Sequence, residues 1–440
     1  MNRIVIETGL GKGVAEYGNT GDISMLQVAV ARIQRLFPTA SVEVLTDSPE
    51  NLARFCPGAS PLDNRGRAIW FANGVLLGRY SDIAPKWLVE LLVSFKKTLR
   101  ERRPGLFETI LIRRLKRRNR PTEAWAVAAF RRSVDDADLL LICGAGGFYD
   151  GCQAWNLDIL DLLEEAVRRG KPAVMLGQGF GPIGDPVVLK RAAKILPRVN
   201  FITLRGGRGS FAILRSLGVD ESKMETTGDE ALELAYESRS GELGRGLGIN
   251  LRFAGSANTD DADVESIRPV LHDFVRRHTA CVIPLPIAMQ VYSRDDLAIK
   301  QLLMGLEEQS DGGETLDSPL KVIDRTALCR VVVTGAYHAA VFALAQGIPV
   351  VGLAKSAYFS SKFLGLEDQF GEGCQTVLFG EPDLPQKLND AIERAWQNAD
   401  KLREPLRAAA LRQIESSRKS YERLKDLAAF PKVAAGHAHI

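Results

Sequence analysis

Short apolar stretches rich in β-branched residues alternate along the chain with longer amphipathic stretches. Apolar runs of this kind are typical of strands buried on both faces of a parallel sheet. They predict strands at Ile4–Glu7, Val42–Leu45, Leu139–Cys143, Ala173–Leu176, Phe201–Leu204, Leu247–Leu251, Ala280–Leu285, Val331–Thr334 and Val350–Leu353. Helical spacing of apolar residues occurs between many of them, for example over Ile23–Phe37, Ile159–Arg169, Val187–Leu196 and Tyr337–Gln346. Strand–helix repetition predicts an α/β protein with parallel sheets.

A segment rich in glycine and serine, Ser238–Gly246, separates two sets of predicted strands. We therefore expect two doubly wound, Rossmann-like domains that face each other across an interdomain cleft. The N-terminal domain is predicted over residues 1–240 and the C-terminal domain over residues 246–383. C-terminal helices are predicted over residues 384–428, with a break at Pro405, and residues 429–440 are predicted to form an unstructured tail.

The composition is that of a globular protein: 45% of the 440 residues are hydrophobic, 25% are charged and the formal net charge is +3, which excludes wholesale disorder. The six cysteines form no CxxC pair, which argues against structural zinc and against a disulfide scaffold. The sequence shows neither an apolar run of about 18 residues nor a secretion signal. We expect a cytoplasmic protein without a metal site.

One stretch departs from this average. Residues 96–132 contain 13 Lys and Arg against three acids, and helical spacing of apolar residues from Trp87 to Leu99 precedes the charges. We predict a basic helical insert in the first domain at about residues 86–132, with a helix break at Pro104–Gly105. The insert either is a solvated helical hairpin or makes a peripheral contact with an anionic membrane surface, which would be the inner face of the plasma membrane. Nucleic acid is disfavoured because no aromatic residues are interleaved with the charges.

Glycine-rich turns follow three of the predicted strands. They lie at Gly9–Gly13 with Gly18–Asp22, at Gly144–Gly147 and at Gly177–Pro182. Ligands of open α/β sheets bind beyond the carboxyl ends of the strands, where glycine lets the backbone approach them closely. A P-loop is excluded because Gly13 rather than Ser or Thr follows Lys12, and the GxGxxG spacing of nicotinamide-binding proteins is not met. Each turn alone is explained by tight chain reversal, whereas the three together predict a ligand cleft.

Other chemically active side chains also stand at strand ends. Arg205 directly follows one strand and can fork onto a carboxylate or phosphate, or form a salt bridge within the domain. Asp229 either faces the cleft or is simply a turn-forming residue. Asn250 and Arg252 end a strand of the second half. His338 stands in the first turn of a predicted helix, a place suited to proton transfer, although a structural histidine is the alternative.

These pieces, in this order, resemble the polysaccharide pyruvyl transferase family. The resemblance covers residues 16 to 370 approximately. The matching positions are Asn19, Gly21, Asp22, Gly144, Gly146, Gly147, Gly177, Gln178, Gly179, Gly181, Pro182, Arg205, Ser210, Asp229, Ala231, Asn250, Arg252, His338, Ala339, Gly347 and Pro349. The family implies a fold like that of the GT-B glycosyltransferases. It also implies transfer of pyruvate from phosphoenolpyruvate, the co-substrate, onto two sugar hydroxyls, with no further cofactor.

The resemblance assigns roles to these positions. His338 is the expected general acid, and the expected donor-binding residues are Arg205, Arg252, Lys355 and Lys362. The expected acceptor or loop residues are Asn19, Gly21, Asp22, Gly146, Gly147, Gln178, Gly179, Asp229 and Asn250. The sequence departs from the family at Ala336, where the family has an arginine, and Lys355 and Lys362 are candidate substitutes. The saccharide acceptor would belong to an exopolysaccharide or a lipid-linked oligosaccharide precursor. The alternatives are a GT-B glycosyltransferase that uses a nucleotide sugar and a non-catalytic saccharide-binding relative.

Overall fold

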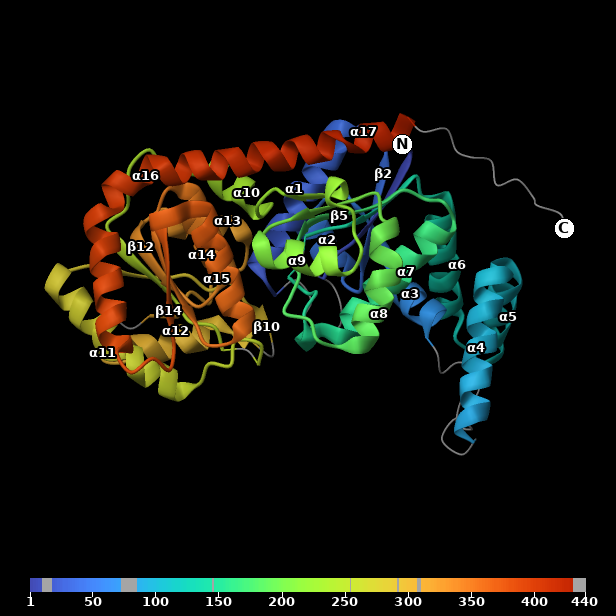
Figure 1. Cartoon of the computed structure of the whole chain (residues 1–440), viewed down its shortest axis with the longest axis horizontal. Helices are drawn as coiled ribbons and strands as arrows, with labels where there is room; N and C mark the ends of the chain where they lie inside the picture. The colour runs from blue at the N-terminus through green and yellow to red at the C-terminus, as the bar shows by residue number, and fades with distance from the viewer. Residues whose placement is uncertain are drawn as a thin grey trace.

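The computed structural model describes residues 1–9, 18–72, 85–144, 146–253, 255–290, 293–306 and 310–429. Two parallel sheets dominate it, and each is covered by helices on both faces (Figure 1). Most of the first predicted glycine loop, Gly9–Gly13, and nearly all of the predicted tail lie outside the described residues. In the part of the chain that is described, no helix is long and apolar enough to cross a membrane.

The first sheet has seven parallel strands in the order β3-β2-β1-β4-β5-β6-β7. They are β1 (Arg3–Glu7), β2 (Ser41–Thr46), β3 (Ser60–Asp63), β4 (Leu139–Ile142), β5 (Ala173–Gln178), β6 (Phe201–Leu204) and β7 (Met224–Thr226). Because β1 lies in the interior of the sheet and the chain winds outward on both sides of it, the sheet is doubly wound. Successive side chains of β1 alternate between the faces, so that Ile4 and Ile6 pack in one hydrophobic cluster and Val5 in another.

Helices of the first half fall into two layers. The helices on the face of Ile4 and Ile6 are α1 (Thr20–Leu36), α2 (Pro49–Phe55) and α10 (Ala231–Glu237). Those on the face of Val5 are α3 (Asn64–Phe71), α5 (Pro104–Arg117), α6 (Pro121–Asp136), α7 (Gln153–Arg168), α8 (Pro186–Ile195) and α9 (Arg208–Ser216). The helix α4 (Lys86–Arg102) projects from this layer (Figure 1).

The second sheet has five parallel strands in the order β14-β13-β12-β8-β9. They are β8 (Gly246–Asn250), β9 (Val282–Pro284), β12 (Cys329–Thr334), β13 (Val350–Ala354) and β14 (Cys374–Leu378). One face carries α13 (Pro319–Thr326), α14 (Tyr337–Gln346) and α15 (Ala357–Phe370), and the other carries α11 (Asp261–His278), α12 (Asp295–Leu303) and the first part of α16 (Leu384–Glu422). The hairpin of β10 (Met289–Gln290) and β11 (Ser293–Arg294) and the short helix α17 (Leu424–Ala429) lie outside these layers.

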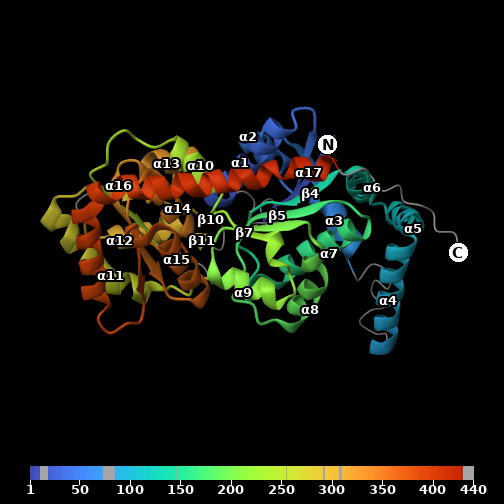
Figure 2. The same cartoon turned by 45° about the horizontal axis from the view of Figure 1, so that its top comes forward.

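The predicted helix break at Pro405 is wrong, because α16 continues through this residue. Proline removes one backbone hydrogen bond, which a long and well-packed helix tolerates as a bend. Figures 1 and 2 show α16 bent, with its first part against the second sheet and its last part along the first domain. There, Arg418 Nη2 lies 2.8 Å from Oε1 of Glu233 in α10. The helix therefore joins the two halves of the molecule.

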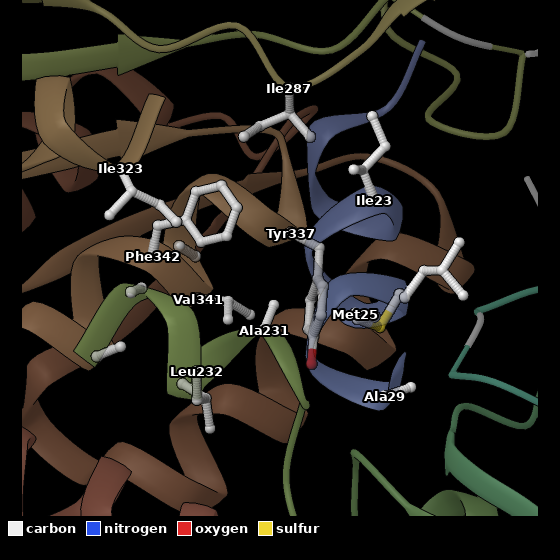
Figure 3. Close-up of a cluster of buried hydrophobic side chains, with 14 of the residues drawn as sticks. Ile23, Met25, Ala29, Ala231, Leu232, Ile287, Ile323, Tyr337, Val341 and Phe342 are labelled. Atoms are coloured by element: carbon white, nitrogen blue, oxygen red, sulfur yellow. The ribbon is translucent and has the colours of Figure 1, made fainter. Parts of the chain in front are cut away.

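A shared hydrophobic cluster also joins the halves. All ten residues of α14 are buried, which agrees with a helix sequence that is apolar on every side. Figure 3 shows Val341 and Phe342 of α14 near Ala231 and Leu232 of α10, with Ile23 of α1 on the opposite side of the cluster. Burying each large apolar side chain contributes about 1.5–3 kcal/mol. This packing fixes the first turn of α14, which carries His338, between the two sheets.

The predicted basic insert is only partly an appendage. The break at Pro104–Gly105 is present, since α4 ends at Arg102 and α5 begins at Pro104. Its last part, however, forms α6, which packs against α3 and buries Val127 and Phe130 in the core below the first sheet. Only α4 and α5 remain as a basic hairpin beside the domain.

Candidate functional site

A cavity of about 430 Å³ lies between the two halves of the molecule. The turns after β4, β5 and β6 contribute Gly146, Gly179 and Arg205, and the second domain contributes Tyr337 from α14 together with Tyr358 and Lys362 from α15. The carboxyl ends of parallel strands lie at the same edge of a sheet, which is the usual ligand position in this class of fold. The second and third of the predicted glycine-rich turns thus line the cavity, whereas Gly18–Asp22 of the first turn do not.

Arg205 is held rigidly in the wall of this cavity. Its guanidinium is buried, Nη1 lies 3.3 Å from Oδ2 of Asp229, and its Cζ lies 4.5 Å from the centre of the Tyr337 ring. The amide of Gln369 donates a 2.6 Å hydrogen bond to the backbone carbonyl of Arg205. A guanidinium fixed in this way loses little conformational entropy when it binds an anion.

His338 lies on the other side of Asp229. Its Nε2 is 3.6 Å from Oδ2 of that carboxylate and has no hydrogen-bond partner among the described residues. Burial alone would raise the pKa of Asp229, but the imidazole of His338 and the guanidinium of Arg205 outweigh it and hold the pKa of this carboxyl below its usual value. His338 is only 5% exposed and is not part of the cavity wall; Asp229 lies between its ring and Arg205, which does line the cavity.

The glycines of the turns make room for protein side chains. A Cβ at Gly21 would lie 2.0 Å from Cγ of His338, and one at Gly146 would lie 2.1 Å from Nη2 of Arg205. A Cβ at Gly179 would lie 3.2 Å from Nε of Arg205, and one at Gly147 would lie 2.4 Å from the Trp155 ring. Bare backbone is therefore needed here to seat the histidine and the arginine.

Lys362 brings a second cation to the cavity. Its Nζ lies 3.9 Å from the centre of the Tyr358 ring, 5.0 Å from that of Phe359 and 5.6 Å from that of Tyr337. No carboxylate of the described chain pairs with it, and burial followed by repulsion from Arg205 lowers its pKa well below the usual value. Aromatic faces stabilise an ammonium only in part, so a bound anion would gain from this site.

The aromatic wall around Lys362 is itself fixed. Tyr358 stacks on Tyr149, with ring centres 3.9 Å apart, and its hydroxyl donates a hydrogen bond to the carbonyl of Gly146. Two tyrosines of the wall, Tyr337 and Tyr358, were not predicted from the sequence as residues of the site. A signal was present for one of them, because Tyr358 and Lys362 are four positions apart and share a helix face.

Asn250 and Arg252 are bound to a buried carboxylate beyond the cavity. Oδ2 of Asp295 accepts a 3.0 Å hydrogen bond from Nδ2 of Asn250 and a 3.1 Å hydrogen bond from Nη2 of Arg252. Asn250 also donates to the carbonyl of Leu285, at 3.0 Å. These bonds secure the carboxyl end of β8, and neither side chain is part of the cavity wall.

The structure also places Lys355 elsewhere. Its ammonium lies 3.0 Å from Asp260 and 2.9 Å from Asp263, the residues that cap α11, and it does not line the cavity. Its charge is already compensated. Of the two lysines proposed to replace the missing family arginine, only Lys362 faces the cavity.

The remaining predicted loop residues have local partners. The amide of Gln178 is buried and donates to the carbonyls of Ile142, Cys143 and Leu176. Asn19 caps α1 by accepting from the backbone N–H groups of Gly21 and Asp22. Asp22 is partly buried in the first turn of α1, near enough for its charge to oppose the lowering of the Lys362 pKa. Within the described ranges no group of three His, Cys, Asp or Glu is arranged to hold a metal ion.

The model of the polysaccharide pyruvyl transferase family matches residues 19–356, which include the cavity residues up to the first turn of α14. The chain belongs to this family. It is therefore a transferase family member of polysaccharide biosynthesis, as the resemblance in the sequence implied. No curated protein sequence is significantly similar to the chain.

Solved structures establish the fold of this family member. A UDP-GlcNAc 2-epimerase from Neisseria meningitidis, bound to UDP-GlcNAc, is 11% identical with a TM-score of 0.54, covering 97% of this chain and 100% of the epimerase. A putative UDP-N-acetylglucosamine 2-epimerase from Listeria monocytogenes is 10% identical with a TM-score of 0.53, covering 96% of each chain. These similarities and the sheet topology confirm the predicted fold of two Rossmann-like domains of the GT-B kind.

Proposed function

We propose that this pyruvyl transferase family member moves pyruvate from phosphoenolpyruvate onto two hydroxyls of one sugar, in an exopolysaccharide or a lipid-linked oligosaccharide precursor. The observation that carries the proposal is the pair of cations in one cavity, Arg205 and Lys362. Phosphoenolpyruvate carries two anionic groups, a carboxylate and a phosphate. A rigid guanidinium suits bidentate binding of one group, and the unpaired ammonium suits the other.

The chemistry needs a proton donor next to these cations, and His338 is the proposed one. Protonation of the methylene carbon creates an oxocarbenium-like centre at the neighbouring carbon, which a sugar hydroxyl attacks. The second hydroxyl then displaces phosphate, and a cyclic ketal remains. Of the two hydroxyl protons released, one balances the proton that the carbon gained and the other leaves with phosphate. Asp229 orients the imidazole and keeps Arg205 aligned with it.

The departure at Ala336 fits this arrangement. Ala336, which precedes α14, is buried and is not part of the cavity wall, and the two cations of the cavity come from the turn after β6 and from α15. Arg205 lies over one face of Tyr337, and Lys362 is also near this ring. The donor charge is thus compensated by Arg205 and Lys362 in place of the usual family arginine.

Purified protein should release inorganic phosphate from phosphoenolpyruvate only when a saccharide acceptor is present. A parallel reaction with UDP-GlcNAc tests the nucleotide-sugar alternative. A thermal-shift series with both donors adds a binding readout, because a ligand that binds only the folded protein raises the midpoint. Stabilisation by UDP-GlcNAc together with no response to phosphoenolpyruvate would contradict the proposal.

A further inference from the structure

The helices α4 and α5 form a hairpin that stands out from the first domain (Figures 1 and 2). One side of the hairpin is fixed to the protein. The side chain of Arg100 is buried and donates to the carbonyls of Trp70 and Phe71, at 3.3 and 3.4 Å. Phe107 of α5 packs edge-on against Trp70, with ring centres 5.0 Å apart. The orientation of the hairpin is therefore set by the domain and leaves its other side free.

The free side of α4 carries large apolar residues. Trp87, Leu91 and Phe95 are 66%, 59% and 60% exposed, and their spacing of four places them on one face of the helix. In α5, Leu106 and Ile110 are 54% and 41% exposed with the same spacing. These five large apolar side chains of one hairpin are exposed and are not covered by any other part of the chain that the structure describes. We call these five residues the apolar stripe.

The same hairpin is strongly basic. Residues 86–120 contain 12 Lys and Arg against three acids, a net charge of +9, whereas the rest of the chain has a net charge of −6. Helical spacing continues the stripe into basic residues, since Arg102 lies on the face of Phe95, and Arg113 and Arg117 lie on the face of Ile110. Positive charge thus flanks the exposed aromatic residues.

We propose that the α4–α5 hairpin docks on the surface of an anionic lipid bilayer. Trp and Phe with flanking Lys and Arg are the side chains of helices that lie in the membrane interface. Each basic residue near an anionic surface strengthens binding by roughly fivefold. A second copy of the chain is a poorer occupant, because a symmetric contact through this hairpin would bring two surfaces of charge +9 together.

Co-sedimentation of the full-length protein with vesicles tests the proposal. One set contains phosphatidylcholine and phosphatidylglycerol at about 70:30, and the other contains phosphatidylcholine alone. We expect binding to the anionic vesicles only, weakened at high salt because the charges are exposed. The variant W87S/F95S should lower the affinity at least tenfold, and R113Q/R117Q should lower it by a similar factor. The control L297S/L328S changes two leucines of the second domain that are each 48% exposed, and it should bind like the wild type.

The other outcomes would overturn the proposal. They are absence of binding to both vesicle sets, equal binding of W87S/F95S and the wild type, and equal loss in the control. A dimer that W87S/F95S converts to a monomer would show that a second copy covers the stripe. Every substituted side chain is exposed, so unchanged thermal midpoints verify that the variants are folded. Phosphate release with a soluble acceptor separates a failure of docking from a failure of the proposed catalytic function.

Discussion

Nε2 of His338 lies 3.6 Å from Oδ2 of Asp229, and the same oxygen lies 3.3 Å from Nη1 of Arg205. One buried carboxylate thus connects the proposed acid to the proposed donor-binding cation. Because these partners hold the pKa of Asp229 below its usual value, this carboxylate is ionised at neutral pH. It approaches a ring whose Nε2 has no hydrogen-bond partner among the described residues.

Replacing His338 with glutamine should lower kcat for phosphate release by about 100-fold or more, since a positioned proton donor typically contributes that factor. The KM for phosphoenolpyruvate should change little, because Arg205 and Lys362 remain. Steady-state rates between pH 6 and 9 measure both quantities. His278→Gln is the matched control, since this histidine pairs with Glu393 on the far side of the second domain and should keep the wild-type rate. Undiminished turnover in His338→Gln would show that His338 is not the general acid.

The substitution Gly21→Ala should displace the imidazole of His338 while leaving its chemical groups unchanged. Alanine in a helix normally gains up to about 1 kcal/mol over glycine. At this position, however, the new Cβ would lie 2.0 Å from Cγ of His338, so the ring or α1 must move. We expect a loss of about 1–3 kcal/mol in stability, as for other overpacked sites, together with at least tenfold lower turnover.

The control for this substitution is Gly105→Ala. Gly105 also lies in a helix, and a Cβ there would meet no atom within 4 Å. This variant should match or exceed the wild type in thermal midpoint and keep its rate. A Gly21→Ala protein that is more stable and fully active would show that the imidazole position is not constrained by α1.

The nine strands predicted from apolar runs are all present, because strands covered by helices on both faces must be apolar throughout. The prediction missed the two strands of the small hairpin, β10 and β11, and three of the four edge strands of the two sheets, which are β3, β7 and β14; the fourth edge strand, β9, was predicted. Edge strands are partly exposed and tolerate polar residues and proline, as in the sequence SPLD of β3. The periodicity argument has no signal for such strands.

The sequence predicted those residues of the site whose positions follow from the ends of strands. Arg205, Asp229 and His338 follow strands or begin a helix at the inner edges of the two sheets, and the structure brings them together. The prediction placed Lys355 at the donor site, but its ammonium binds Asp263 of α11 instead. The two residues are 92 positions apart in the sequence. Such long-range pairing depends on helix positions that a pattern of hydrophobicity does not contain.

Lys362 should make donor binding depend on pH. Its lowered pKa means that the free protein holds less of the charged ammonium, whereas a bound anion favours the charged form. Binding of phosphoenolpyruvate should therefore take up a proton, and its affinity should fall as the pH rises above the pKa of the free lysine. Calorimetric titrations at pH 6.5, 7.5 and 8.5, in buffers of different ionisation enthalpy, measure both effects.

Two substitutions isolate this lysine. Lys362→Met should weaken binding by at least tenfold and remove most of the pH dependence. Lys362→Arg should retain part of the affinity with a flatter pH dependence, because a guanidinium stays charged throughout this range. Lys355→Met should change the affinity less than twofold, since that lysine is paired with Asp260 and Asp263 outside the cavity. Equal losses in Lys355→Met and Lys362→Met would contradict the placement of the donor site.

Glu230, next to Asp229 in sequence, should make the stability of the protein fall as the pH rises. Burial raises its pKa to about 7, although Tyr421 donates a 2.6 Å hydrogen bond to its carboxyl. The unfolded chain loses this proton near its ordinary pKa of about 4.5, so the native state holds more protons between these values. The stabilising effect is complete below the unfolded pKa and is lost as the pH rises through the folded pKa, with a limit on the order of 3 kcal/mol. Asp229 adds no slope above pH 5, because its pKa is lowered.

Thermal midpoints between pH 5 and 8 test this linkage, and the variant Glu230→Gln isolates it. Glutamine keeps the shape of the side chain and an oxygen for the Tyr421 hydroxyl but does not titrate, so the wild type should lose stability relative to this variant as the pH rises. Other groups that titrate in the same range affect both proteins alike and cancel in the difference. Glu415→Gln, at an exposed position of α16, should keep the wild-type pH dependence. Parallel curves for the wild type and Glu230→Gln would contradict the prediction and would mean that the buried carboxyl is ionised in the native protein, where the charge of Arg32 favours the ionised form.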